Sequence, residues 1–427
     1  MKRYDFPALD ERYFETTLSC GLRVRVIPKP GFSKTYAVMA VNYGAIDTAF
    51  TLDGMTRVTP NGVAHYLEHK MFDMPYGDAM NRFSQFGGNP NAFTSYTMTA
   101  YYVECTERLR ENLQTLVEFV TTPYFTEQSV EKERGIIAQE IRMYEDSPGS
   151  RVYENLFRGM YRNHPVRVPI AGTVESIQEI TTGTLELCHR AFYAPGNAML
   201  CVAGDVDPEE IAKTAEEQMP QSMPAMARRE YGPAEEPTPA ERTVRQEMEI
   251  SMPTFLLGFK GVPPKPGMET MKREFVGDLT ADLMLGPTSP LYSELYGEGL
   301  VDGGFSAGYE GMRGVSLFSA GGESKDPDAV VERIFREAER IRREGFDPDL
   351  FRCLKQASLG RKVRELDSLE NICLRSCETC FDGAEYFRMD EVLQSVTPED
   401  VQAFAEEYLR EDRATVSVIY PNRKRSD

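Results

Sequence analysis

Two of the four histidines in this 427-residue chain lie four residues apart, with a glutamate directly before the second. His65, Glu68 and His69 occur in the stretch "VAHYLEHKMF", which contains no helix breaker. On a helix both imidazoles would lie on one face, where they could bind a single zinc ion. Glu68 would lie close enough to take a proton from water, in the order H-x-x-E-H. A pair of surface histidines is the simpler alternative.

A catalytic zinc ion needs a third protein ligand and an open position for water. The candidates are Glu133 and Glu140 in "EKERGIIAQEIRMYEDSPG", which lie two helical turns apart among isoleucines. Buried carboxylates are costly without a charged partner, so this stripe favours a metal. A solvated acidic face explains the same spacing, and the periodicity leaves the two interpretations open.

The elements that must position these residues occur twice. "IQEITTGTLELCHRAFYAPGNAMLCVAGDV" and "LQSVTPEDVQAFAEEYLREDRATVSVIYP" each predict a helix followed by a strand, with a threonine able to cap the helix. Upstream, both halves show strand, helix, turn and helix, and Phe125 and Phe346 occupy matching turns. This alignment places Arg361 opposite Glu140, and the second copy contains no histidine. We therefore expect a duplication in which only the first half carries the chemistry.

The predicted fold is α+β, with two duplicated domains arranged around a chamber. Each domain is expected to be a sheet rich in antiparallel pairs, with helices packed on one face. We expect an N-terminal metal-bearing domain at residues 1–220 and a C-terminal degenerate repeat at residues 244–427. Residues 221–243 are rich in proline and charge, which predicts a linker.

Composition narrows the classes of partner. The formal net charge of −19 argues against nucleic acid and against an anionic membrane surface. We find no apolar run of membrane-spanning length and no basic-then-apolar start, so we expect a cytoplasmic protein. Cys373, Cys377 and Cys380 have a spacing seen in iron–sulfur enzymes. On a helix the same spacing lines one face, and we favour core packing.

The chain resembles the pitrilysin/insulinase family of zinc peptidases, the inverzincins, over most of its length. "HYLEH" resembles the family's metal motif, "ERGIIAQE" its downstream glutamate segment, and "NAFTSYTMTAYYVE" the strand after the metal helix. "NHPVRVPIAGTVESI" and "FYAPGNAMLCVAGDV" resemble later landmarks of the N-terminal half. The resemblance is strongest to half-length bacterial members, which processing-peptidase-like enzymes use as subunits.

The resemblance implies a zinc-dependent endopeptidase in which His65, His69 and Glu140 bind Zn²⁺ and Glu68 is the general base. It implies that Glu133 is an auxiliary acidic residue, which orients His69 or the water. It also implies an open sheet edge, where an extended peptide substrate adds as a further strand. The residues implied for this edge are Asn91, Ala92, Phe93 and Thr94.

The sequence departs from the family in its second half. Active members usually carry an arginine and a tyrosine in a segment resembling L-R-E-x-x-G-L-x-Y, whereas this chain has "LYSELYGEGLVDGGFSAGY". Tyr296 stands at the arginine position and Asp302 at the tyrosine position, while Tyr309 is off register. We therefore expect a heterodimer with a metal-less sister subunit that carries the Arg/Tyr pair, or a homodimer. A non-proteolytic assembly subunit and a peptide-binding module are the alternative functions.

Overall fold

The structure is a computed structural model, and it describes residues 1–219 and 226–422. The chain forms two compact units, each of which combines several segments of the sequence. Unit 1 comprises Met1–Ile141, Pro169–Tyr231 and Val363–Arg388, and unit 2 comprises Arg142–Val168, Gly232–Lys362 and Met389–Asp427. Residues 221–225 of the predicted linker lie outside the described residues. The predicted domain boundaries at residues 220 and 244 and the predicted chamber stay predictions.

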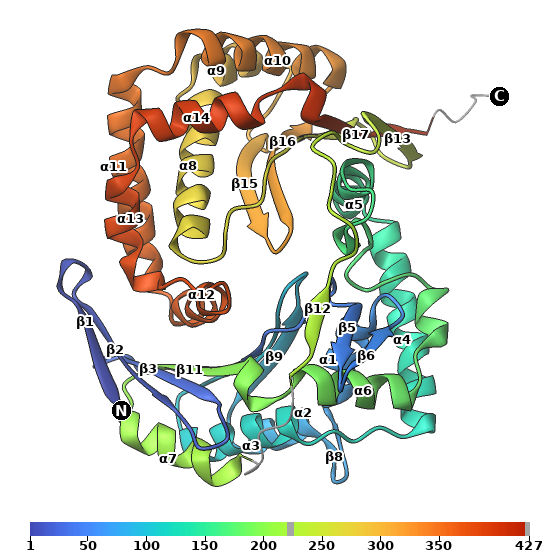
Figure 1. Cartoon of the computed structure of the whole chain (residues 1–427), viewed down its shortest axis with the longest axis vertical. Helices are drawn as coiled ribbons and strands as arrows, with labels where there is room; N and C mark the ends of the chain where they lie inside the picture. Colours follow the sequence, from blue (N-terminus) through green and yellow to red (C-terminus); the bar gives the residue numbers. More distant parts are fainter. Residues whose placement is uncertain (220–225, 423–427) are drawn as a thin grey trace. The chain divides into compact units, whose positions relative to one another are not determined.

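Among the described residues, unit 1 contains a seven-stranded sheet with the spatial order β1-β2-β3-β11-β4-β10-β9. Figure 1 labels β1, β2, β3, β11 and β9 of this sheet. Neighbouring strands are antiparallel except β3 and β11, which are parallel. Both β1 and β9 are edge strands. The strands are β1 (Lys2–Phe6), β2 (Glu11–Thr17), β3 (Arg23–Pro28), β4 (Thr35–Val41), β9 (Asn89–Thr94), β10 (Thr99–Cys105) and β11 (Ala198–Gly204).

Most helices of unit 1 share one hydrophobic core with one face of this sheet. Alternate strand residues such as Val24 and Val26, or Leu200 and Val202, point into that core. The helices that contribute to it are α1 (Val63–Met71), α2 (Ala79–Gln85), α3 (Leu109–Thr121), α4 (Glu127–Glu145), α6 (Thr182–Phe192) and α7 (Pro208–Gln218). A smaller sheet, β12-β5-β6, consists of β5 (Ala49–Leu52), β6 (Met55–Val58) and β12 (Arg228–Glu230).

Unit 2 repeats this topology. Its sheet has the order β13-β17-β14-β16-β15, where only β13 and β17 are parallel. This order matches β3-β11-β4-β10-β9 strand for strand, which confirms the predicted duplication of an α+β fold. The strands are β13 (Thr243–Met248), β14 (Thr254–Lys260), β15 (Ser306–Met312), β16 (Val315–Glu323) and β17 (Ala414–Pro421). The helices of the repeat are α8 (Met268–Leu285), α9 (Pro290–Gly297), α10 (Pro327–Glu344), α11 (Pro348–Glu365), α13 (Met389–Ser395) and α14 (Pro398–Tyr408).

Each sheet also carries one helix on its other face, and this helix comes from the opposite half of the sequence. In unit 1, α12 (Leu369–Phe381) packs on β11 and β4. Cys201 alternates with core-facing Leu200 and Val202 along β11 and lies beside Cys373 and Cys377 of α12. In unit 2, α5 (Pro148–Met160) packs on β14 and β17 in the same manner.

Both predicted threonine caps are present. The Thr181 side chain accepts a hydrogen bond from the backbone N–H of Thr184 at the start of α6. The Thr397 side chain accepts one from Asp400 at the start of α14. In each case the side chain of the third helical residue accepts a hydrogen bond from the backbone N–H of the cap residue. The two helices therefore begin with the same capping box.

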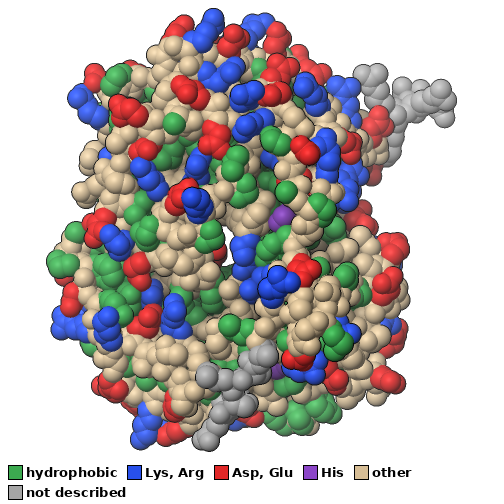
Figure 2. All heavy atoms as spheres, in the orientation of Figure 1, with side chains coloured by type: hydrophobic (Ala, Val, Ile, Leu, Met, Phe, Trp, Pro, Cys, Tyr) green, Lys and Arg blue, Asp and Glu red, His purple; other side chains and the backbone are tan. Residues whose placement is uncertain are grey.

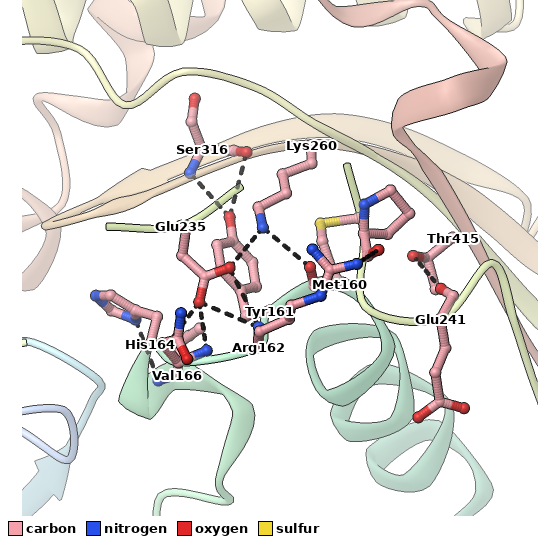
Figure 3. Close-up of polar contacts among 12 residues, drawn as sticks. Met160, Tyr161, Arg162, His164, Val166, Glu235, Glu241, Lys260, Ser316 and Thr415 are labelled. Atoms are coloured by element: carbon pink, nitrogen blue, oxygen red, sulfur yellow. Dashed lines mark hydrogen bonds and ion pairs between the residues drawn. The ribbon is translucent and has the colours of Figure 1, made fainter. Parts of the chain in front are cut away.

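Part of the predicted linker is fixed to unit 2 by one carboxylate (Figure 3). Glu235 accepts hydrogen bonds from the backbone N–H groups of Arg162, Asn163 and His164 and from the Lys260 ammonium group. Lys260 also donates to the carbonyl of Met160. Burial raises the pKa of Glu235, but these donors outweigh it and lower the pKa to about 2. The segment after residue 231 is therefore held by a charge-assisted cluster.

The face of the molecule drawn in Figure 2 carries charges of both signs. Figure 2 shows acidic and basic side chains intermingled over the face that it presents. Within the described residues, no helix is both long enough and apolar enough to cross a membrane.

Candidate metal centre

The helix α1 begins at Val63, the first residue of the stretch without a helix breaker. Gly62 is its N-cap residue, with φ of 86°, and a Cβ atom there would lie 2.4 Å from the carbonyl oxygen of Ala171. Only glycine fits this start without strain. His65 and His69 then share one face of α1, and their ring centroids are 4.6 Å apart. The start of the helix therefore sets the orientation of both imidazoles.

Glu140 of α4 completes a three-residue group with these histidines. His65 Nε2 lies 3.5 Å from Glu140 Oε1, and His69 Nε2 lies 3.4 Å from Glu140 Oε2. One ligand atom from each residue lies within 4.8 Å of the other two. Two ligands bonded to one tetrahedral zinc ion are about 3.3–3.4 Å apart, given bonds of about 2.0–2.1 Å. The two nitrogen–oxygen distances are therefore close to those between ligands of one ion.

Glu133 contacts His69 from the other side of the ring. His69 Nδ1 lies 3.0 Å from Glu133 Oε1. A carboxylate only accepts, so Nδ1 carries the proton and Nε2 is the nitrogen left for a metal. Burial would lower the pKa of His69, but hydrogen bonds to Glu133 and Glu140 raise it to about 10. A metal ion must therefore displace a proton from His69 at neutral pH.

His65 is held differently. Its side chain is buried, and its Nδ1 atom has no hydrogen-bond partner among the described residues. Its Nε2 atom faces Glu140. The described residues thus fix the tautomer of His69 but not that of His65.

Glu68 is buried beside the two histidines, with 8% of its surface exposed. Its Oε2 atom accepts a hydrogen bond from the Thr94 hydroxyl at 3.0 Å. Burial raises the pKa of Glu68, although the neighbouring His65 and His69 oppose the shift. A carboxylate with a raised pKa is a stronger proton acceptor, as a general base requires.

The strand β9 lies at the edge of the sheet, paired on one side with β10. The backbone N–H of Ala92 donates to the side chain of Asn91 at 2.9 Å, so this donor is outside the β9–β10 ladder. By strand alternation, the main chain of Thr94 faces the same free side as that of Ala92. The four residues predicted for substrate binding, Asn91–Thr94, thus lie in the edge strand, and the last of them, Thr94, contacts Glu68.

The second repeat has an ion pair at the corresponding place. Arg361 of α11, which aligns with Glu140, donates to Asp282 of α8 at 2.6 Å. Asp278 lies one turn earlier on α8, and burial raises its pKa to about 6. Arg361 therefore places a positive charge beside Asp282, whereas Glu140 in the first repeat faces two histidines. Unit 2 thus keeps the architecture of the first repeat without its ligands.

The cysteines play no part in this group. Cys373 and Cys377 are fully buried and Cys380 is partly buried. The one cluster with metal-ligand spacing found among residues 1–219 and 226–422 is His65, His69 and Glu140. These observations agree with core packing for the cysteine run.

One contact was not predicted from the sequence. The sequence predicted that the segment containing Thr94 binds substrate, but it did not predict that the Thr94 side chain contacts Glu68 directly. The two residues lie 26 positions apart, and no periodic pattern links a strand end to the preceding helix at that separation. A strand predicted directly after the metal helix is the only sequence signal that could have suggested this contact.

Comparisons with known proteins agree with the motifs. Residues 57–174 match the family model "Insulinase (Peptidase family M16)", and residues 179–358 match "Peptidase M16 inactive domain". The "Uncharacterized zinc protease YmfH" of Bacillus subtilis (strain 168) is 38% identical over 436 residues, covering 99% of each chain.

A solved structure of an M16-like peptidase also matches this chain over nearly its full length. The putative M16-like peptidase from Alicyclobacillus acidocaldarius has 37% sequence identity and a TM-score of 0.94, covering 96% of this chain and 99% of that chain. The "Mitochondrial-processing peptidase subunit beta" of Caenorhabditis elegans is 29% identical over 206 residues, which is 47% of this chain and 43% of that protein. The predicted resemblance is therefore confirmed, and the chain belongs to peptidase family M16.

Proposed function

We propose that this chain is a zinc-dependent endopeptidase subunit that hydrolyses peptides or small unfolded polypeptides. The observation that carries the proposal is the convergence of His65, His69 and Glu140 beside the buried carboxylate of Glu68. Two imidazoles and one carboxylate form a donor set typical of catalytic zinc, which keeps a further position open. A relative with 38% identity is named a zinc protease, which agrees with this choice of metal.

When bound, zinc supplies a Lewis acid that lowers the pKa of water and stabilises negative charge on the substrate oxygen. The residues of the chain perform the remaining steps. Glu68 takes a proton from water and returns it to the nitrogen of the leaving amine. Glu133 accepts the Nδ1 proton of His69, which would leave Nε2, on the side of Glu140, as the nitrogen that binds zinc.

The open edge of β9 is the proposed site for the substrate main chain. A peptide that adds beside β9 would pair with outward-facing groups such as the Ala92 N–H, which Asn91 now occupies. Main-chain pairing supplies affinity that does not depend on side-chain identity. This mode of binding fits an extended peptide and predicts broad sequence tolerance.

We further propose that full activity needs a second chain. Tyr296 is exposed at the end of α9, and Asp302 caps the loop that follows by accepting a hydrogen bond from Gly304. Neither side chain can supply a cation to the substrate carbonyl. A sister subunit that carries the Arg/Tyr pair would supply it, and a homodimer is the alternative assembly. One relative is itself named a subunit.

All eight cysteines are free thiols, which fits a cytoplasmic location.

The test is turnover of a quenched-fluorescent peptide library by the zinc-loaded chain, alone and mixed with a candidate sister subunit. We expect weak hydrolysis by the single chain and a strong increase with the partner. Hydrolysis should stop on addition of a chelator and in the Glu68→Gln variant, which should retain zinc. Glu107→Gln, at an exposed glutamate of the same unit, is the matched control.

Other outcomes separate the alternative functions. Peptide binding without turnover under every condition would favour a peptide-binding module. A chain that neither binds nor cleaves peptides would favour an assembly subunit. Turnover that survives both the chelator and Glu68→Gln would contradict the proposed chemistry.

A further inference from the structure

The side chain of Thr94, at the end of β9, contacts Glu68, the proposed general base. Thr94 Oγ1 donates to Glu68 Oε2 at 3.0 Å. Thr94 is the last residue of β9 and pairs with Thr99, the first residue of β10. The hydrogen bond therefore joins the edge strand to helix α1 at the point where β9 ends.

The direction of this hydrogen bond follows from the carboxylate of Glu68, which only accepts, and the neighbouring hydroxyl of Thr99 is the competing acceptor. Thr99 is fully buried, and its Oγ1 atom donates to the carbonyl of Tyr43 at 2.9 Å. A hydroxyl has one proton, so Thr99 has none to give to Thr94 Oγ1, which lies 3.5 Å away. The single proton of Thr94 could then go to Thr99 Oγ1 or to Glu68, and the shorter 3.0 Å separation makes the carboxylate the better acceptor. Thr99 therefore donates to Tyr43 and Thr94 donates to one oxygen of Glu68, so the two hydroxyls make separate hydrogen bonds.

This arrangement makes the two oxygens of Glu68 unequal. Oε2 accepts from Thr94, whereas Oε1 makes no hydrogen bond to Thr94. A carboxylate that is free to rotate would present either oxygen to water, with no fixed distance from the substrate strand. A hydrogen bond from the end of β9 removes that freedom and sets the base relative to the strand.

We propose that Thr94 is a positioning residue for Glu68, in an inference that rests on the proposed peptidase function. Its hydroxyl holds Oε2, leaves Oε1 to take the proton from water, and ties the base to the edge strand that would hold the peptide. The proton moves from water to Oε1 and then to the leaving nitrogen, while the Thr94 proton stays on its own oxygen. Thr94 thus acts through its side chain as well as through its main chain.

The chain offers a matched control for the test. Thr51 of β5 also donates from its hydroxyl to a glutamate, Glu230 of β12, at 2.7 Å. Thr51→Val therefore removes the same kind of hydrogen bond from a strand of the same unit, away from the proposed base. Thr94→Val removes the hydroxyl with little change of shape, and Thr94→Ser keeps it.

The experiment measures kcat and KM for a fluorogenic peptide with zinc-loaded protein, including the partner chain where activity needs it. We expect Thr94→Val to lower kcat by about 10- to 100-fold with KM within about 3-fold of wild type. Thr94→Ser should restore most of kcat, and Thr51→Val should stay within about 2-fold of wild type. Zinc content and melting temperature establish that each variant is folded and loaded.

A second readout needs no turnover. In crystal structures of the metal-free variants, Glu68 should leave its position in Thr94→Val and keep it in Thr94→Ser. An unmoved Glu68 in Thr94→Val, or a rise in KM at constant kcat, would overturn the inference. An inactive wild-type protein would count against the proposed function instead, and the position of Glu68 would then decide the role of Thr94 by itself.

Discussion

Replacing Glu133 tests how this chain orients a metal ligand. The carboxylate lies 3.0 Å from Nδ1 of His69, and 17% of its side chain and 24% of the histidine side chain are exposed. Glu133→Ala removes the acceptor, so Nδ1 loses the partner that fixes its proton. Glu133→Gln keeps an acceptor oxygen but removes the charge. The two variants therefore separate orientation by any hydrogen bond from orientation by a charged one.

The magnitude follows from the strength and exposure of this contact. Loss of a carboxylate that supports a metal-bound histidine commonly weakens metal affinity by about 10- to 100-fold. Water reaches part of both side chains here, so we expect the lower end of that range, about 10-fold for Glu133→Ala. A neutral hydrogen bond is about half as strong as a charged one, so Glu133→Gln should weaken zinc binding by about 3-fold.

Competition with a chromophoric chelator at fixed pH measures the zinc dissociation constant. Glu131→Gln is the matched control, because Glu131 lies on the same helix with 72% of its side chain exposed and pairs with Arg134. That variant should bind zinc as wild type does. A dissociation constant for Glu133→Ala within about 2-fold of wild type would refute the role assigned to Glu133.

Two further predictions concern folding. Glu235→Gln leaves the buried Lys260 ammonium without its ion-pair partner and should destabilise the fold by about 3 kcal/mol at neutral pH. Glu236→Gln, at the exposed neighbour whose charge acts on Lys260 more weakly, should have a much smaller effect. Melting temperatures of wild type and Glu235→Gln measure this loss of stability. Because the folded-state pKa of Glu235 is lowered to about 2, the difference between the two melting temperatures should be largest above about pH 4.5 and should shrink as pH falls toward 2. A difference that does not change with pH would contradict the role assigned to the Glu235 charge. Gly62→Ala places a Cβ atom 2.4 Å from a backbone carbonyl oxygen and should lower both melting temperature and zinc affinity, whereas Gly31→Ala, with a similar φ and open space, should lower melting temperature only slightly. Equal effects of the two glycine substitutions would show that the contact at Gly62 is unimportant.

The sequence was sufficient for features that depend on local spacing. The helix that carries His65 and His69 covers the stretch without a helix breaker, because a four-residue interval and the absence of breakers are local properties. The duplication was also predictable, because both halves repeat the same order of strands, helices and threonine caps. The spacing of Glu133 and Glu140 left a solvated face as an alternative. Both side chains proved largely buried and directed at the histidines.

Features that depend on tertiary contacts could not be predicted. An amphipathic pattern shows that α12 has a buried face, but not that this face packs on a sheet from the other half of the sequence. Glu235 stands in a proline-rich stretch that suggests a solvated linker, and only the folded chain brings three backbone amides and a lysine to it. The Thr94–Glu68 hydrogen bond likewise requires the end of a strand to meet a helix that no local pattern places there.

The most direct test of the central claim is anomalous diffraction at the zinc edge from crystals of the zinc-loaded protein. We expect one strong peak per chain, at about 2.0–2.2 Å from a nitrogen of His65, a nitrogen of His69 and an oxygen of Glu140. The same data from Glu140→Gln crystals should show a weaker peak or none. A strong peak elsewhere, for example at the cysteines of α12, or no peak at these three residues after zinc loading, would contradict the metal centre proposed for this chain.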